Sequence, residues 1–167
     1  ITHKGGDLRA FRARDCSSVA TITGMANPNN VDVEYGLNLG GVNVDIAVMT
    51  ERLNNRLLVF RLPNLVQIGA IPTVLPEPMG VVLYKNLSGS INAFVSSKIP
   101  TTNLIQQYQL DGSSGTVTGS LVRRFGDYTT EVEALSVDDE QNRLYVSHEI
   151  SKIDVYNAIN GNFIQSF

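Results

Sequence analysis

The chain has 167 residues, of which 43% are hydrophobic and 17% are charged, a composition typical of a globular domain rather than a disordered segment. Its 13 Lys and Arg residues against 16 Asp and Glu give a net charge of −3, so no basic surface is expected to hold a nucleic acid backbone. The single cysteine, Cys16, excludes an internal disulfide, and no apolar run reaches the ~18 residues that a membrane-spanning helix needs. We therefore expect no nucleic acid partner and no membrane span.

Short segments of alternating apolar and polar residues follow one another along the chain. They are rich in β-branched and aromatic residues and occur at residues 31–37, 42–50, 56–62, 104–110, 134–139, 143–149 and 152–158. Gly, Asn, Asp and Ser separate them, as in "LGG" at 39–41 and "DGSSG" at 111–115, which are residues that hairpin turns favour. The pattern predicts an all-β fold of antiparallel neighbouring strands without a helix.

A repeated sequence pattern subdivides these strands. The segments "AVMTER" at 47–52, "AFVSSK" at 93–98 and "LYVSHE" at 144–149 each place Ser or Thr two residues before a final charge, and the opening "THK" fits the same pattern. The four charged residues, Lys4, Arg52, Lys98 and Glu149, are 46 to 51 residues apart. A period of ~40–50 residues with several strands per repeat is typical of β-propeller blades.

Each repeat continues with a strand that carries an aromatic residue at a matched position, namely Phe11, Phe60, Tyr108 or Tyr156. We expect these aromatic side chains to pack between blades. The sequence thus predicts three four-stranded antiparallel blades at residues 29–72, 73–126 and 127–167, and the end of a preceding blade at residues 1–28. Because both termini lie inside strand patterns, we expect the chain to be part of a longer polypeptide.

In a propeller blade, the start of the innermost strand and the end of the second strand lie at the same rim. This geometry would bring together Lys4, Asn30 to Asp32, Arg52, Met79, Lys98, Glu133 and Glu149. Removing like charges from water side by side is costly unless an anion compensates the cations and a metal ion compensates the carboxylates, which indicates a binding site. The alternative is that each charged residue only keeps a strand end in contact with water. His3 and His148 are interpreted as solvated neighbours of the rim.

Three segments carry a resemblance to a known family. "NNVDV" at 29–33, "VEALSVDDE" at 132–140 and "LYVSHE" at 144–149 resemble the β-propeller phytases, calcium-dependent phosphatases that act on inositol hexakisphosphate. The resemblance runs over nearly the whole chain and implies about half of a six-bladed ring. It also implies an extracellular or periplasmic protein, a phytate substrate, and further blades from the same or another chain.

The resemblance assigns roles to six residues. Lys4, Arg52 and Lys98 match cations that bind substrate phosphates, while Glu133 and Glu149 match carboxylates that bind Ca²⁺. The backbone carbonyl of Val31 matches a further calcium ligand. The implied chemistry is phosphomonoester hydrolysis of the 3-phytase type by a calcium-activated water, without a covalent nucleophile.

The chain also departs from the family pattern. Met79 stands where a Tyr is usual and Ala134 where a Gly is usual, and the aspartates near the family's N-terminus have no counterpart here. Two interpretations follow. The chain is part of a phytase-like phosphatase, or it is a catalytically incomplete propeller segment that binds calcium or phosphorylated ligands or serves assembly.

Overall fold

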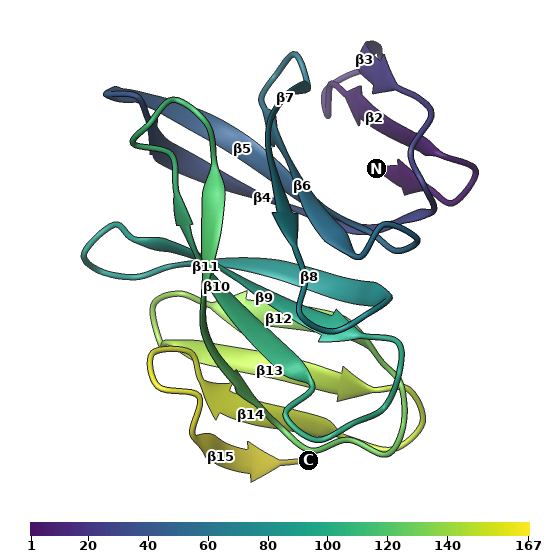
Figure 1. The fold of residues 1–167 in the computed structure, drawn as a ribbon, viewed down its shortest axis with the longest axis vertical. Helices are drawn as coiled ribbons and strands as arrows, with labels where there is room; N and C mark the ends of the chain where they lie inside the picture. Colours follow the sequence, from purple (N-terminus) through teal and green to yellow (C-terminus); the bar gives the residue numbers. More distant parts are fainter.

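A computed structural model describes all residues 1–167 and contains fifteen strands and no helix (Figure 1). The strands form one three-stranded and three four-stranded sheets, in which neighbours in the sheet are also neighbours in the chain. The sheets comprise β1 Thr2–His3, β2 Asp7–Phe11 and β3 Ser18–Ile22; β4 Pro28–Leu39, β5 Val42–Glu51, β6 Arg56–Arg61 and β7 Val66–Pro72; β8 Pro78–Lys85, β9 Ile91–Ser97, β10 Ile105–Asp111 and β11 Thr118–Phe125; β12 Val132–Asp138, β13 Arg143–His148, β14 Ile153–Asn157 and β15 Phe163–Ser166.

Every strand pair within the sheets is antiparallel, and the sheets follow one another through the molecule from the N-terminal to the C-terminal end (Figure 1). The first strands of consecutive four-stranded sheets lie against each other, β4 beside β8 and β8 beside β12. This is the arrangement of innermost strands around a propeller axis, so the predicted fold class is confirmed. The ring is not closed within these residues.

The three-stranded sheet corresponds to the last three strands of a blade. Its first strand, β1, contacts the innermost strand β4 of the next sheet, just as the second strands β5 and β9 contact β8 and β12. The equivalence of β1 with β5 and β9 agrees with the sequence repeat, which aligned "THK" with the ends of those strands. The N-terminal sheet is therefore the partial blade that the period predicted.

Apolar side chains fill the space between successive sheets. Val48 on β5 belongs to a cluster of 15 buried residues between the sheets β4–β7 and β8–β11, whereas its neighbour Met49 faces the N-terminal sheet. A cluster of 12 buried residues joins β8–β11 to β12–β15. Because side chains alternate between the two faces of a strand, a blade packed on both faces needs the nearly continuous apolar runs seen in the sequence.

The matched aromatic residues behave as expected in three blades and differently in the fourth. Phe60, Tyr108 and Tyr156 are buried within the apolar clusters, whereas Phe11 is 43% exposed. The side chain of Phe11 lines an apolar hollow with Leu8.

The innermost strands approach each other closely at their first residues. A Cβ atom added to Gly80 on β8 would lie 2.5 Å from the carbonyl oxygen of Glu133 on β12, a backbone atom that cannot move aside. Glycine at this position therefore permits the close approach of β8 and β12.

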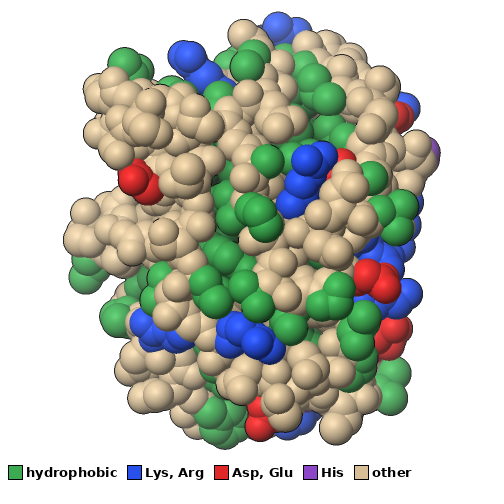
Figure 2. Space-filling view, in the orientation of Figure 1, with side chains coloured by type: hydrophobic (Ala, Val, Ile, Leu, Met, Phe, Trp, Pro, Cys, Tyr) green, Lys and Arg blue, Asp and Glu red, His purple; other side chains and the backbone are tan.

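Charged side chains of both signs are scattered over the face shown in Figure 2, without gathering into one basic or acidic patch. No helix long and apolar enough to cross a membrane is found in the chain.

Candidate phosphate-binding rim

Buried hydroxyl groups connect consecutive blades where the innermost strands begin. The Thr50 hydroxyl donates to the carbonyl of Met79 (2.8 Å), and the Ser96 hydroxyl donates to the carbonyl of Val132 (2.6 Å). Thr2 makes the same contact with the carbonyl of Asn29. These Ser and Thr residues precede Lys4, Arg52 and Lys98 by two positions, and in each of the three cases the acceptor belongs to the next blade.

A second repeated hydrogen bond fixes the charged residues themselves. The backbone N–H of Arg52 donates to the carbonyl of Asn27 (3.2 Å), and that of Lys98 donates to the carbonyl of Glu77 (2.9 Å). In the last blade, the N–H of Glu149 donates to the carbonyl of Glu131 (3.1 Å). Each acceptor comes directly before an innermost strand, so the three charges lie at one rim. Lys4 follows Thr2 in the turn after β1 and lies at the same rim.

The three cations differ in their surroundings. Arg52 is largely buried, with 12% of its side chain exposed, and its guanidinium pairs with the Glu77 carboxylate at 2.5 Å. Lys4 is exposed and Lys98 half-buried, and neither side chain makes an ion pair or hydrogen bond. The two lysines therefore offer unpaired ammonium groups, whereas a ligand would meet Arg52 already in contact with an acid.

Glu133 lies in a β-bulge at the start of β12, and its side chain is exposed. Its carbonyl accepts a hydrogen bond from the side-chain amide of Asn30 on β4 at 3.1 Å, across the intervening strand β8. Val31 follows Asn30 directly after a bulge in β4 and is half-buried. The structure thus brings the first residues of β4 and β12 together, and with them Val31 and Glu133.

Glu149 is exposed, but the neighbouring His148 is not the solvated residue that the sequence analysis expected. Only 9% of the His148 side chain is exposed, its Nε2 lies 2.8 Å from a carboxylate oxygen of Asp154, and its ring packs at an angle of 59° against Tyr128 with centroids 4.7 Å apart. Burial alone would raise the pKa of Asp154, but hydrogen bonds from Ser166, His148 and Lys152 hold this pKa below its ordinary value. The expectation for His148 was wrong because its hydrogen-bonding partner Asp154 comes from the following strand.

The proposed calcium ligands do not make a complete site within this chain. Calcium takes about six to eight oxygen ligands. No group of three or more Asp, Glu, His or Cys side chains in the structure could hold a metal ion. The carboxylates of Glu133 and Glu149 together with the Val31 carbonyl are too few for the full coordination shell. The residues present therefore do not fit a whole calcium site.

Sequence reasoning missed Glu77, which contacts both predicted cations of the middle blades. Its carboxylate binds the Arg52 guanidinium, and its carbonyl accepts the N–H of Lys98. Its position in the repeat could have identified Glu77, because Glu77 precedes β8 just as Asn27 precedes β4. Asn27 and Glu77 also share a positive φ, of 58° and 47° respectively.

Comparison with known proteins decides the family. The family model described as Phytase matches residues 15–164. The chain belongs to the β-propeller phytase family. This phytase-family chain is 32% identical over 146 residues to the 3-phytase of Bacillus subtilis (strain 168), an alignment that covers 78% of the chain and 36% of that enzyme. The chain thus spans about a third of the length of this curated relative.

Two solved structures share the fold of this phytase-family chain. The computationally designed Ika4 protein is 14% identical, with a TM-score of 0.58, and the match covers 92% of this chain and 81% of that chain. The computationally designed Ika8 protein is 12% identical, with a TM-score of 0.59 over 96% of this chain and 42% of that chain. At such low identities these similarities concern the fold alone.

Proposed function

We propose that the rim carrying Lys4, Arg52 and Lys98 binds the phosphate groups of a phosphorylated polyol, with inositol hexakisphosphate as the first candidate. We propose further that the chain takes part in phosphomonoester hydrolysis. The observation that carries the proposal is the repeated backbone hydrogen bond that brings Arg52, Lys98 and Glu149 to one rim in a phytase-family chain. In this reaction a water oxygen bonds to phosphorus, the ester P–O bond breaks, and the alcohol leaves with a proton.

The cations of the rim suit this chemistry. Phosphate oxygens accept charge-assisted hydrogen bonds from ammonium and guanidinium groups, and these bonds are stronger than neutral ones. The side chain of Lys98 has no partner within the chain, so it is free to meet a phosphate group. For Arg52, the substrate would have to compete with the Glu77 carboxylate or bind beside it.

The test is phosphate release from inositol hexakisphosphate by the full-length protein and by Lys98→Ala. Loss of one charge-assisted hydrogen bond of about 1.5–3 kcal/mol predicts a decrease in kcat/KM of about 10- to 100-fold. Arg14→Ala removes an exposed cation in the turn between β2 and β3, at the opposite rim, and serves as the matched control. An equal effect of both substitutions would exclude a specific role for Lys98.

We also propose calcium as the metal of this protein, with Glu133 and Glu149 supplying only part of its ligands. Calcium titration of the metal-free full-length protein by calorimetry tests this directly. Glu133→Gln should weaken calcium binding at least tenfold, because a carboxylate is exchanged for a neutral amide. The control is Glu140→Gln, which changes an exposed acid in the turn between β12 and β13. Unchanged calcium binding in Glu133→Gln would remove this residue from the ligand set.

One observation favours a second candidate, phosphate binding without turnover. The chain has no group of three potential metal-ligating side chains. Saturable binding of inositol hexakisphosphate that depends on Lys98, with no release of phosphate in the presence of calcium, would favour this alternative.

A further inference from the structure

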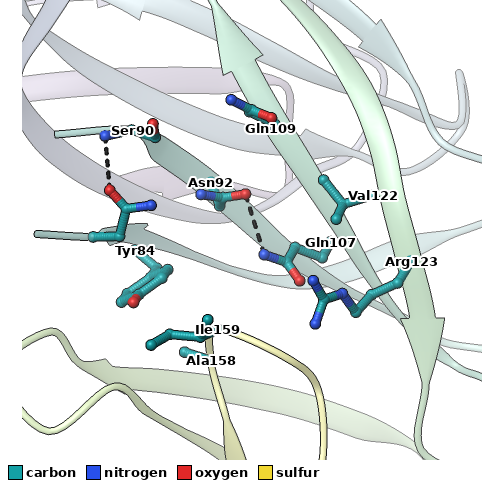
Figure 3. Close-up of a pocket in the computed structure, with 10 residues that line it drawn as sticks. Tyr84, Ser90, Asn92, Gln107, Gln109, Val122, Arg123, Ala158 and Ile159 are labelled. Carbon is teal, nitrogen blue, oxygen red and sulfur yellow. Dashed lines mark hydrogen bonds between the residues drawn. The ribbon is translucent and has the colours of Figure 1, made fainter. Parts of the chain in front are cut away.

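A polar pocket lies between the sheets β8–β11 and β12–β15, away from the rim described above (Figure 3). Its residues Ser90 and Asn92 lie where β9 begins, whereas Lys98 follows the opposite end of that strand. The cavity volume is about 170 Å³. At ~30 Å³ per water molecule this is room for about five or six waters, or for one small organic molecule. Both sheets that form the pocket have four strands, so the cavity lies between complete blades.

A buried side-chain amide in this pocket has an unused hydrogen-bonding atom. Gln107 is 4% exposed, and its amide nitrogen donates to the side-chain oxygen of Asn92 at 3.1 Å. The other amide atom of Gln107, Oε1, is buried and accepts no hydrogen bond. Figure 3 shows this oxygen on the side of the pocket where Arg123 and Ile159 lie. Nearly all buried polar atoms have a partner, so a buried acceptor without a partner beside a cavity indicates a donor that comes from outside the chain.

Arg123 supplies an uncompensated positive charge in the same pocket. Its guanidinium makes no ion pair and no hydrogen bond, although the residue is half-buried. The adjacent Arg124 instead donates to the carbonyls of Asn103 and Thr102. The aliphatic stem of Arg123 packs against the turn between β14 and β15, where a Cβ atom on Gly161 would lie 3.1 Å from its Cδ. The side chain is thus held at the pocket by packing, not by a counter-charge.

We propose that this pocket binds a small anion that also carries a hydroxyl group. The anionic group would pair with the guanidinium of Arg123, which can hold two oxygens of a carboxylate or phosphate. The hydroxyl would donate to Oε1 of Gln107 and thereby satisfy the buried acceptor. Tyr84 and Ile159 line the pocket as well and would contact the carbon skeleton of the ligand. This site is distinct from the rim, and the proposal does not depend on the proposed phosphatase activity.

The test is calorimetric titration of the full-length protein with D-gluconate and with glycerol 3-phosphate. Sulfate lacks the carbon skeleton and glycerol lacks the charge, so both serve as ligand controls. We expect at least one of the two probes to bind at least tenfold more tightly than either control. Saturation by D-gluconate alone would identify carboxylates as the ligands, and saturation by glycerol 3-phosphate alone would identify phosphate esters.

Substitutions test whether the two probes bind in this pocket. Arg123→Gln should weaken binding at least tenfold, whereas Arg124→Gln on the same strand should leave it unchanged. Ile159→Trp blocks the pocket from a position that is 56% exposed, so it tests the site even where Arg123→Gln fails to fold. The proposal is overturned if both probes bind no better than sulfate and glycerol, or if Arg123→Gln and Ile159→Trp bind like wild type.

Discussion

Ser96→Ala is the substitution that best tests how consecutive blades are joined. The Ser96 side chain is fully buried, and its oxygen both accepts the N–H of Gly80 (2.9 Å) and donates to the carbonyl of Val132 (2.6 Å). The first contact lies within the blade and the second reaches the next blade. Alanine removes both contacts and leaves two backbone groups without partners, in a place that water does not reach.

The expected loss follows from these two groups. A buried donor or acceptor left without a partner costs about 1–3 kcal/mol. Both groups lose the same partner atom, so the two costs do not add in full, and we expect the free energy of unfolding to fall by about 2–4 kcal/mol. For a domain of ~150–250 residues each kcal/mol lowers Tm by ~2–4 °C, which predicts a decrease of about 5–15 °C. The free energy of unfolding is measured by urea denaturation and Tm by calorimetry.

Two matched variants make the result specific. Ser96→Thr keeps the hydroxyl and gives the residue found at the equivalent Thr50, so it should lose much less stability than Ser96→Ala. Ser120→Ala removes an exposed hydroxyl and should change the free energy of unfolding by less than about 0.5 kcal/mol. A urea midpoint of Ser96→Ala equal to that of wild type would show that this hydroxyl does not join the blades.

The remaining predictions concern the innermost strands and a buried ion pair. Gly80→Ala should lower both the Tm and any phosphatase activity, because its Cβ would displace the Glu133 backbone, whereas at Gly5 alanine would meet only the flexible His3 side chain and should be tolerated. Burial tends to raise the pKa of Glu51, but hydrogen bonds, led by the one from Arg56, hold that pKa below its ordinary value of 4.5. A lowered folded-state pKa means that Glu51 stabilises the fold fully above about pH 4.5 and loses this contribution as the pH falls through the folded pKa. Glu51→Gln should therefore be less stable than wild type by about 1–3 kcal/mol at pH 7, with a difference that shrinks in acid, and a pH-independent difference in urea melts would contradict this.

The blade architecture could be predicted from the sequence because it depends on local patterns that recur. Strand alternation, turn residues and the Ser or Thr two residues before each charge are all visible within a few positions of one another. The spacing of Lys4, Arg52 and Lys98 then places them at one rim, since equivalent positions of successive repeats lie at equivalent places in successive blades. The exposure of Phe11 was not predicted, because it depends on how neighbouring sheets pack and not on its own segment.

The pairing of side chains could not be predicted in the same way. Glu77 reaches Arg52 from 25 positions away, and His148 reaches Asp154 through the register of β13 with β14. Each contact depends on side-chain direction and on residues from another strand, which a repeat of about 50 residues does not encode. The unpaired Arg123 was missed for the same reason, because an absent partner leaves no trace in the sequence.

The repeated hydrogen bonds also explain how one rim can carry charges of different sign without a change of fold. The charged residue contributes its backbone N–H to the carbonyl before the innermost strand, as at Arg52, Lys98 and Glu149. Its side chain is not needed for that bond, and it follows the last residue of the strand, so no ladder partner restricts it. The hydroxyl two residues earlier, as in Thr50 and Ser96, makes the contact to the next blade. These contacts therefore depend on the hydroxyl and the backbone, so side chains of either charge fit at this position without a change of fold.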